Sequence, residues 1–121
     1  MSKLILVVED QEDNRRIMRD LLSSVGYEVI EAVTGEEGVA AADTHRPDLI
    51  LMDIQLPGLD GYEATRQIKA NPELEHIPII VVTSYALSGD DVKAFEAGCN
   101  AYVSKPFSPR ELLAKIREYL P

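Results

Sequence analysis

The chain has 121 residues, and 45% of them are hydrophobic, which is enough for one globular domain with a substantial core. Its formal net charge of -9 disfavours direct binding to the phosphate backbone of nucleic acids. The single cysteine, Cys99, excludes an internal disulfide, and we expect it to be a small buried side chain in a reducing compartment. The longest apolar runs are far shorter than the roughly 18 residues of a membrane helix, and no signal peptide is recognisable. We therefore expect a single-domain cytoplasmic protein without a membrane association.

The first part of the chain predicts two strands separated by a helix. The run from Leu4 to Val8 is almost entirely apolar, which is typical of a strand covered on both faces. Asp10 is placed to cap the following helix, and Gly26 is placed to end it. The apolar residues that recur at helical spacing between them are Ile17, Met18, Leu21, Leu22 and Val25. The segment from Glu28 to Ala32 alternates polar and apolar residues, which indicates an edge strand.

The middle of the chain repeats this alternation. Thr34 and Glu37 form a capping box for a second helix, which ends before Pro47. A third strand, from Leu49 to Met52, leads directly into Asp53. The features predicted next are a loop from Ile54 to Leu59, a helix that is capped by Asp60 and Glu63 and stops at Asn71-Pro72, and a strand from Ile79 to Val82 followed by Thr83.

The last part adds a short helix, a strand and a final helix. Ser88 and Asp91 are start signals for a helix that closes at Gly98, and Ala101 to Ser104 predict a brief strand. The segment from Ser108 to Glu111 is a complete helix start, with a cap, a proline at the first helical position and a glutamate partner. The residues expected on the buried face of this helix are Leu112, Leu113, Ile116 and Leu120.

Five alternating strand and helix units predict an α/β fold with a doubly wound parallel sheet in the order 2-1-3-4-5 and a flavodoxin-like three-layer sandwich. The carboxyl ends of all five strands then meet at one edge of the sheet. The reactive side chains that follow these strands are Glu9, Asp10, Asp53, Thr83 and Lys105. We therefore predict a site for a divalent cation and a phosphoryl group at this edge.

Three carboxylates held together need compensation, because a pair about 4 Å apart costs roughly 4 kcal/mol at an effective dielectric constant near 20. Either one acid is protonated, as in a general acid/base pair, or a cation binds. Mg2+ favours a few carboxylates completed by water and phosphate oxygens. The alternative is that Glu9 and Asp10 only cap a helix and that Asp53 only begins a turn.

Asp53 is also a candidate nucleophile. A carboxylate can attack phosphorus in line to form an aspartyl phosphate once a metal and a lysine neutralise the transferring oxygens. Lys105 has the required charge, and a cis bond to Pro106 would direct it, although a lone lysine at a strand end is more often solvated. For Thr83 and Tyr102 the alternatives are an ordinary strand-end hydroxyl and a half-buried core ring.

Four segments in this order and spacing, VVED, LMDIQLPGLDGYE, VVTSYAL and AYVSKPFSPRELL, resemble the receiver domain of two-component response regulators. The resemblance covers the whole chain and is strongest to the free-standing type, so we expect residues 1–121 to form a receiver without an output domain. It implies a phosphorylation-dependent signalling switch rather than an enzyme with a separate substrate. The implied donor is a histidine kinase or a histidine phosphotransfer protein, and an unidentified protein target would respond to the phosphorylated state.

The resemblance also implies a role for each site residue. Asp53 would be phosphorylated, and Lys105 would neutralise the phosphoryl group, so that the protein assists its own phosphoryl transfer and dephosphorylation. Thr83 would bind a phosphoryl oxygen in the active state, and Tyr102 would turn inward behind it. The implied Mg2+ ligands are Asp10, Asp53 and the backbone carbonyl of Gln55, with Glu9 holding the metal through water.

Two side chains near the acceptor are expected to modulate the lifetime of the phosphorylated state. Gln55 and Tyr85 each lie two positions beyond a site residue and flank the path of an attacking water. Tyr85 is bulky enough to shield the acyl phosphate. We therefore predict a longer lifetime than in receivers with small or acidic residues at that position.

Two surfaces are candidates for partner binding. Arg15, Arg16 and Arg19 on the first helix either dock the donor helices or form a solvated face. Output is expected through the face of the fourth helix, fifth strand and fifth helix, and the residues singled out there are Lys93, Phe95, Arg110 and Lys115. Asn100 and Ala101 replace an acidic pair common in receivers that dimerise on this face, so we expect a monomer or a weak dimer.

Two other functions fit parts of the sequence. A small phosphohydrolase could also pass through an aspartyl phosphate, but Gln55 stands where such enzymes usually carry a second acid. A receiver-like module could bind its partner without being phosphorylated, but the chain retains Asp10, Asp53, Thr83 and Lys105. A phosphorylated switch therefore remains the principal prediction.

Overall fold

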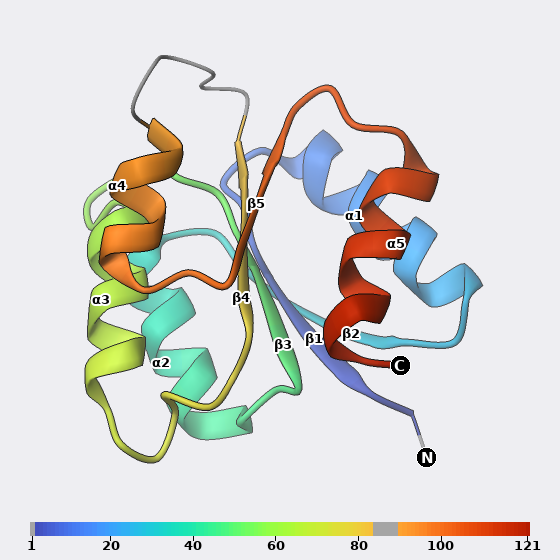
Figure 1. Ribbon diagram of the computed structural model, residues 1–121. Coiled ribbons are helices and arrows are strands. Elements are labelled where there is room, and N and C mark those ends of the chain that lie inside the picture. Colours follow the sequence, from blue (N-terminus) through green and yellow to red (C-terminus); the bar gives the residue numbers. More distant parts are fainter. Residues whose placement is uncertain (1, 84–89) are drawn as a thin grey trace.

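The sheet has the predicted topology. The computed structural model describes residues 2–83 and 90–121, with the backbone alone described at Thr83 and Asp90 (Figure 1). Its five parallel strands are β1 (Leu4–Val8), β2 (Glu28–Ala32), β3 (Leu49–Met52), β4 (Ile79–Thr83) and β5 (Ala101–Ser104). They lie in the order β2-β1-β3-β4-β5 and every pairing is parallel, which confirms the predicted α/β fold and places the alternating strand β2 at an edge.

Helices cover both faces of this sheet and create two cores. The helices are α1 (Glu12–Ser24), α2 (Gly35–His45), α3 (Gly61–Ala70), α4 (Asp90–Ala97) and α5 (Pro109–Tyr119). Figure 1 shows α2, α3 and α4 on one face and α1 and α5 on the other. Alternate strand residues supply the two sides, so that Leu6, Ile50 and Val81 belong to one core and Val7 and Leu51 belong to the other. Among the described residues no helix is long and apolar enough to span a bilayer.

Three of the predicted helix caps are confirmed and one is wrong. The confirmed pairs, in which a side-chain oxygen accepts a backbone N–H, are Thr34 with Glu37 at 3.0 Å, Asp60 with Glu63 at 2.9 Å, and Ser108 with Glu111 at 3.1 Å. Asp10 does not cap α1, because the residue at the cap is Gln11, whose side chain makes no capping hydrogen bond. The start of α4 at Asp90 lies close to the predicted one, whereas Ser88 lies outside the described residues.

The apolar face of α1 is only partly buried. Met18 and Leu22 are buried against the sheet, as predicted. Ile17 and Val25, which share their spacing, are 59% and 40% exposed. The apolar stripe of α1 is therefore wider than the surface that the sheet and α5 can cover, and Ile17 is left at the rim.

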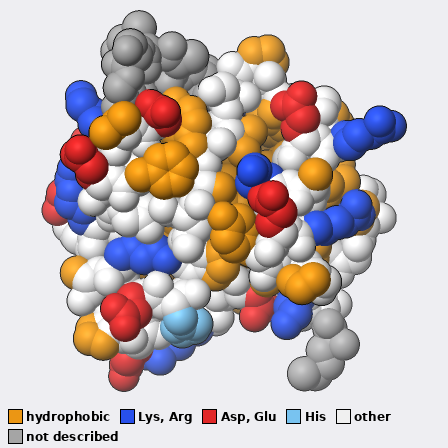
Figure 2. All heavy atoms as spheres, in the orientation of Figure 1, with side chains coloured by type: hydrophobic (Ala, Val, Ile, Leu, Met, Phe, Trp, Pro, Cys, Tyr) orange, Lys and Arg blue, Asp and Glu red, His pale blue; other side chains and the backbone are white. Residues whose placement is uncertain are grey.

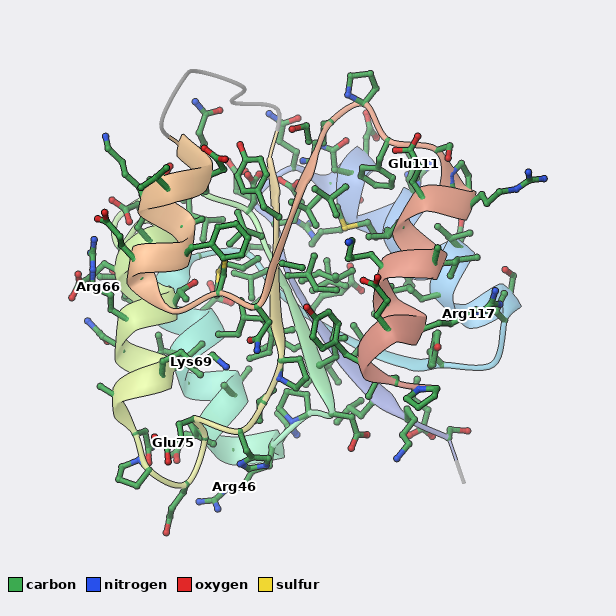
Figure 3. The ribbon with its side chains drawn as sticks, in the orientation of Figure 1. Arg46, Arg66, Lys69, Glu75, Glu111 and Arg117 are labelled. Atoms are coloured by element: carbon green, nitrogen blue, oxygen red, sulfur yellow. The ribbon has the colours of Figure 1, made fainter. Side chains whose placement is uncertain are left out.

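A half-buried lysine holds the chain where it enters β4. Lys69 on α3 donates hydrogen bonds from Nζ to the carbonyl oxygens of Glu75 at 3.0 Å and Ile77 at 2.7 Å. Figure 3 labels Lys69 on α3 and Glu75 in the segment that joins α3 to β4. Burial lowers the pKa of Lys69. The Lys69 side chain thus supplies hydrogen-bond donors to two backbone carbonyl groups in the loop between α3 and β4.

Candidate functional site

The strand ladders continue one residue past β1 and β3 and bring two acids together. The backbone N–H of Asp53 donates to the carbonyl oxygen of Val8 at 3.0 Å, and that of Glu9 donates to Ala32 at 3.0 Å. Glu9 and Asp53 therefore lie on neighbouring strands at the carboxyl edge of the sheet. The short loop after β1 adds Asp10 to them, as the predicted topology requires.

The three acids form one cluster. One carboxylate oxygen each from Glu9, Asp10 and Asp53 lie within 4.8 Å of one another. Glu9 and Asp53 are buried, with 1% and 8% of their surfaces exposed, whereas Asp10 is open to solvent. The pocket at this point is lined by Asp10, Gln11, Asn14, Asp53, Gln55 and Lys105. A few carboxylates beside an open pocket form the donor set that Mg2+ prefers, since it keeps several water or phosphate ligands.

Lys105 completes the cluster from β5. Its Nζ lies 2.5 Å from Oε1 of Glu9 and 3.6 Å from Oδ2 of Asp53. The Lys105–Pro106 peptide bond is cis, as the sequence analysis considered. The side chain is only 15% exposed, so this lysine is not the freely solvated one of the alternative interpretation.

The two oxygens of Asp53 have different environments. Oδ1 accepts the N–H groups of Ile54 at 2.7 Å and Gln55 at 3.4 Å. Oδ2 lies on the Lys105 side. The loop after β3 therefore orients the carboxylate through one oxygen and leaves the other next to a cation.

Desolvation and the neighbouring charge of Glu9 both shift the pKa of Asp10. Its pKa is raised above the ordinary value of 3.8, first by desolvation and then by a side-chain hydrogen bond with Glu9 and the charge of Glu9, while Lys105 acts in the opposite direction. This position in the cluster also explains why the Asp10 carboxylate is not a helix cap. A divalent cation would relieve the same repulsion.

The remaining predicted site residues are described to different extents. Thr83 ends β4 beside Ser104 at the same edge of the sheet, but its side chain lies outside the described atoms, and Tyr85 lies outside the described residues. Gln55 is exposed at the pocket. Tyr102 on β5 is half-buried and packs against the core on the α2, α3 and α4 side.

Two of the three arginines on α1 make ion pairs within the chain. Arg15 Nε lies 3.5 Å from Glu31 on β2, and its Nη1 donates to the carbonyl oxygen of Glu9 at 3.0 Å. Arg19 Nη1 lies 3.3 Å from the same Glu31. Both ion pairs link α1 to β2 at a partly exposed surface, and a docking role for the arginines of this helix stays a prediction.

An apolar groove next to the acidic pocket was not predicted. It runs between α1 and the segment after β5, and its lining residues are Asn14, Ile17, Met18, Leu21, Lys105, Pro106, Phe107 and Pro109. Asn14 and Lys105 also line the acidic pocket, so the two hollows are adjacent. Asn14 is the third residue of α1, and no local sequence pattern marks it as a pocket residue.

Asn100 has a structural role. Its Oδ1 accepts the N–H of Ile79 at 2.9 Å, and its own N–H donates to the carbonyl oxygen of Ile79 at 2.8 Å. Its carbonyl oxygen accepts the Tyr119 hydroxyl at 2.8 Å. Asn100 thus joins the start of β4 to the end of α5.

Comparisons with known proteins agree with this geometry. The model of the response regulator receiver domain matches residues 5–117. The polar-differentiation response regulator DivK of Brucella anthropi is 47% identical over 120 residues, which cover 99% of this chain and 98% of DivK. Among solved structures, the receiver domain of a sensor histidine kinase from Pseudomonas aeruginosa PAO1, with a magnesium ion coordinated in its active site cleft, is 40% identical with a TM-score of 0.92, covering 99% of this chain and 98% of that one. The chemotaxis protein CheY4 of Vibrio cholerae is 26% identical with a TM-score of 0.92, covering 98% of this chain and 99% of that one.

Proposed function

The chain belongs to the response regulator receiver domain family, and on that premise we propose that Asp53 accepts a phosphoryl group from a phosphohistidine of a kinase or phosphotransfer protein. The observation that carries this proposal is the meeting of Glu9, Asp10 and Asp53 within 4.8 Å, with Lys105 Nζ 3.6 Å from Asp53 Oδ2. The protein is then a phosphorylated switch that assists its own chemistry.

The environment of Asp53 favours Oδ2 as the nucleophile, because Oδ1 already accepts two backbone N–H groups. A bond forms between Oδ2 and phosphorus while the bond between phosphorus and the donor nitrogen breaks. The electron pair of that bond stays on the imidazole, which leaves neutral when its other ring nitrogen carries a proton. Lys105 balances the charge on the phosphoryl oxygens from the neighbouring strand.

The donor set of the cluster fits Mg2+. The ligands would be the carboxylates of Asp10 and Asp53 and the backbone carbonyl of Gln55, with Glu9 holding a metal-bound water. Bound Mg2+ supplies positive charge that offsets the phosphoryl oxygens and the clustered acids. In its absence, Lys105 is the cation that faces Glu9 and Asp53.

We also propose that a helical donor docks in the apolar groove beside α1. The groove lies next to the acidic pocket and shares Asn14 and Lys105 with it, so a helix seated there would lie close enough to present a phosphohistidine to Asp53. Ile17 at its rim is 59% exposed and offers an apolar contact. Arg15 and Arg19 already pair with Glu31 within the chain, and the proposal therefore places the main docking contacts in the groove.

Output is proposed through the face of α4, β5 and α5. Val92 and Phe95 on α4 are 53% and 50% exposed, and Tyr102 on β5 lines a hollow against α5. Figure 2 shows exposed hydrophobic side chains over α4 and in the hollow beside α5, with charged side chains around them. In this proposal the Thr83 hydroxyl moves to bind a phosphoryl oxygen, and the Tyr102 ring turns inward into the space that Thr83 leaves. These movements change the face that the target binds. Tyr85 and Gln55 would set how long that state lasts.

One experiment tests the switch against both rival functions. The protein is incubated with acetyl phosphate and Mg2+, and intact mass is measured for the wild type and Asp53→Asn. A stable gain of one phosphoryl group in the wild type alone supports the switch. Multiple turnover of assorted phosphomonoesters would indicate a phosphohydrolase, and no gain in mass would indicate a module that binds without phosphorylation.

A further inference from the structure

We propose that Glu36, in the first turn of α2, is a positioning residue for the loop that carries the backbone carbonyl of Gln55. The inference rests on the proposed function, in which that carbonyl is a ligand of Mg2+. Glu36 is not among the residues that line the acidic pocket, so it acts through the loop.

The carboxylate of Glu36 lies against the tip of this loop. Its Oε1 accepts the backbone N–H of Leu59 at 3.2 Å. Its Oε2 lies so close to Gly58 that a Cβ at Gly58 would be 2.8 Å from it. The φ angle of Gly58 is 71°, in the left-handed region that favours glycine. Glu36 therefore bonds to the backbone of Leu59 and packs closely against Gly58 in the same turn of the loop.

The start of α2 also packs directly on the loop backbone. A Cβ on Gly35 would lie 2.0 Å from the carbonyl oxygen of Leu59, so there is no room for a side chain at Gly35. The other end of the loop is equally close-packed, since a Cβ on Gly61 would lie 2.0 Å from the carbonyl oxygen of Asp53. These approaches fix the distance between α2 and the loop and keep Glu36 within reach of Leu59.

Hydrogen bonds restrain the loop on both sides of Gln55. On the β3 side, Asp53 Oδ1 accepts the N–H of Gln55, and the carbonyl oxygen of Ile54 accepts the N–H of Gly61 at 2.9 Å. On the far side, Glu36 restrains Leu59 from a separate helix. A loop ordered before the metal arrives loses less conformational entropy when its carbonyl becomes a ligand. Glu36 is therefore expected to increase Mg2+ affinity without touching the metal.

The test separates the hydrogen bond from the charge of Glu36. Glu36→Ala removes both the acceptor and the charge, whereas Glu36→Gln removes the charge and keeps a carbonyl oxygen that can accept from Leu59. The Mg2+ dissociation constant is measured by calorimetry for both variants and the wild type. Urea unfolding and the rate of labelling by acetyl phosphate at saturating Mg2+ are measured on the same samples.

We expect Glu36→Ala to raise the Mg2+ dissociation constant by about threefold or more, and Glu36→Gln to remain near the wild type. The labelling rate at saturating Mg2+ should be the same in all three proteins, because the loop is ordered once the metal is bound. An unchanged constant in Glu36→Ala, or an equal rise in both variants, would overturn the positioning role. A wild type that binds no Mg2+ would instead refute the proposed function on which this role depends.

Discussion

Glu9 and Lys105 form an ion pair across the carboxyl edge of the sheet, with 2.5 Å between Oε1 and Nζ. The Glu9 side chain is 1% exposed, and Lys105 is the cation that faces its buried carboxylate. The same lysine lies 3.6 Å from Asp53, and the pair is therefore both a structural bond and the charge balance of the proposed phosphorylation site. The stability and the chemistry of this edge are linked through one side chain.

Loss of the lysine should destabilise the fold. Lys105→Met leaves Glu9 buried without a cation, and breaking a buried pair in this way costs about 3 kcal/mol or more in the free energy of unfolding. Urea unfolding without Mg2+ measures the effect. The double variant Glu9→Gln/Lys105→Met is the control and should recover much of the loss. Equal destabilisation in the single and double variants would show that the pair is not coupled.

Neutralising Asp10 should have the opposite effect in the absence of metal. The raised pKa of Asp10 means that its ionised form is disfavoured in the folded chain. The penalty is fully present above the raised pKa and disappears as the pH falls toward 3.8, the ordinary value for an aspartate. Asp10→Asn should therefore raise the urea midpoint at pH 7, and its advantage should shrink on acidification.

The same variant tests the metal site. Mg2+ should raise the urea midpoint of the wild type, because a ligand that binds only the folded state stabilises it. Asp10→Asn should lose this response, since it removes one of the clustered carboxylates. A variant that still gained stability from Mg2+ as the wild type does would exclude Asp10 from the ligands.

Cys99 should be an unreactive thiol. It is 7% exposed, and burial raises its pKa from 9.0 to about 11, with the nearby Lys69 acting in the opposite direction. Two pKa units reduce the thiolate fraction about 100-fold at pH 8, and burial slows access further. Iodoacetamide labelling followed by mass spectrometry should be slower than for a free thiol by at least this factor. Labelling in urea at the same pH is the control and should proceed at the free rate.

Thr65 on α3 offers a stabilising substitution. Its hydroxyl oxygen is fully buried and, among the residues that the structure describes, has no hydrogen-bond partner. Thr65→Val keeps the shape and removes the unsatisfied group, which should increase the free energy of unfolding by about 1 kcal/mol. Thermal unfolding measures the change, and Thr65→Ser serves as the comparison because it keeps the hydroxyl and loses a methyl group. A destabilised Thr65→Val protein would contradict the absence of a partner.

Docking of the donor in the groove beside α1 can be tested by introducing one charged side chain there. Ile17→Asp places a carboxylate where the donor helix is proposed to pack, and transfer from a kinase that phosphorylates the wild type should slow by about tenfold. Labelling by acetyl phosphate should be unchanged, because Ile17 does not line the acidic pocket. Val25→Asp is a matched control at an exposed apolar position outside the groove. Equal effects of the two substitutions on transfer would argue against docking in the groove.

Local sequence patterns were enough to predict the order of the elements, the parallel sheet and the shared edge of the acids. Hydrophobic periodicity and helix caps report which face of each segment is buried, and these signals are local. They identified the strand before Asp53 and three helix starts, and the alternation of strands and helices then required the doubly wound order. Recognition of Asp53 and Lys105 as partners followed from that order.

The pairing of side chains could be read only from the folded chain. Lys105 bonds to Glu9, Arg15 and Arg19 bond to Glu31, and Asn100 joins β4 to α5. Each of these contacts joins different elements of the fold, so it depends on distances between side chains that no local pattern contains. The exposed rim of α1 has the same origin, because a helix stripe shows which residues are apolar but not how much of that stripe the neighbouring elements can cover.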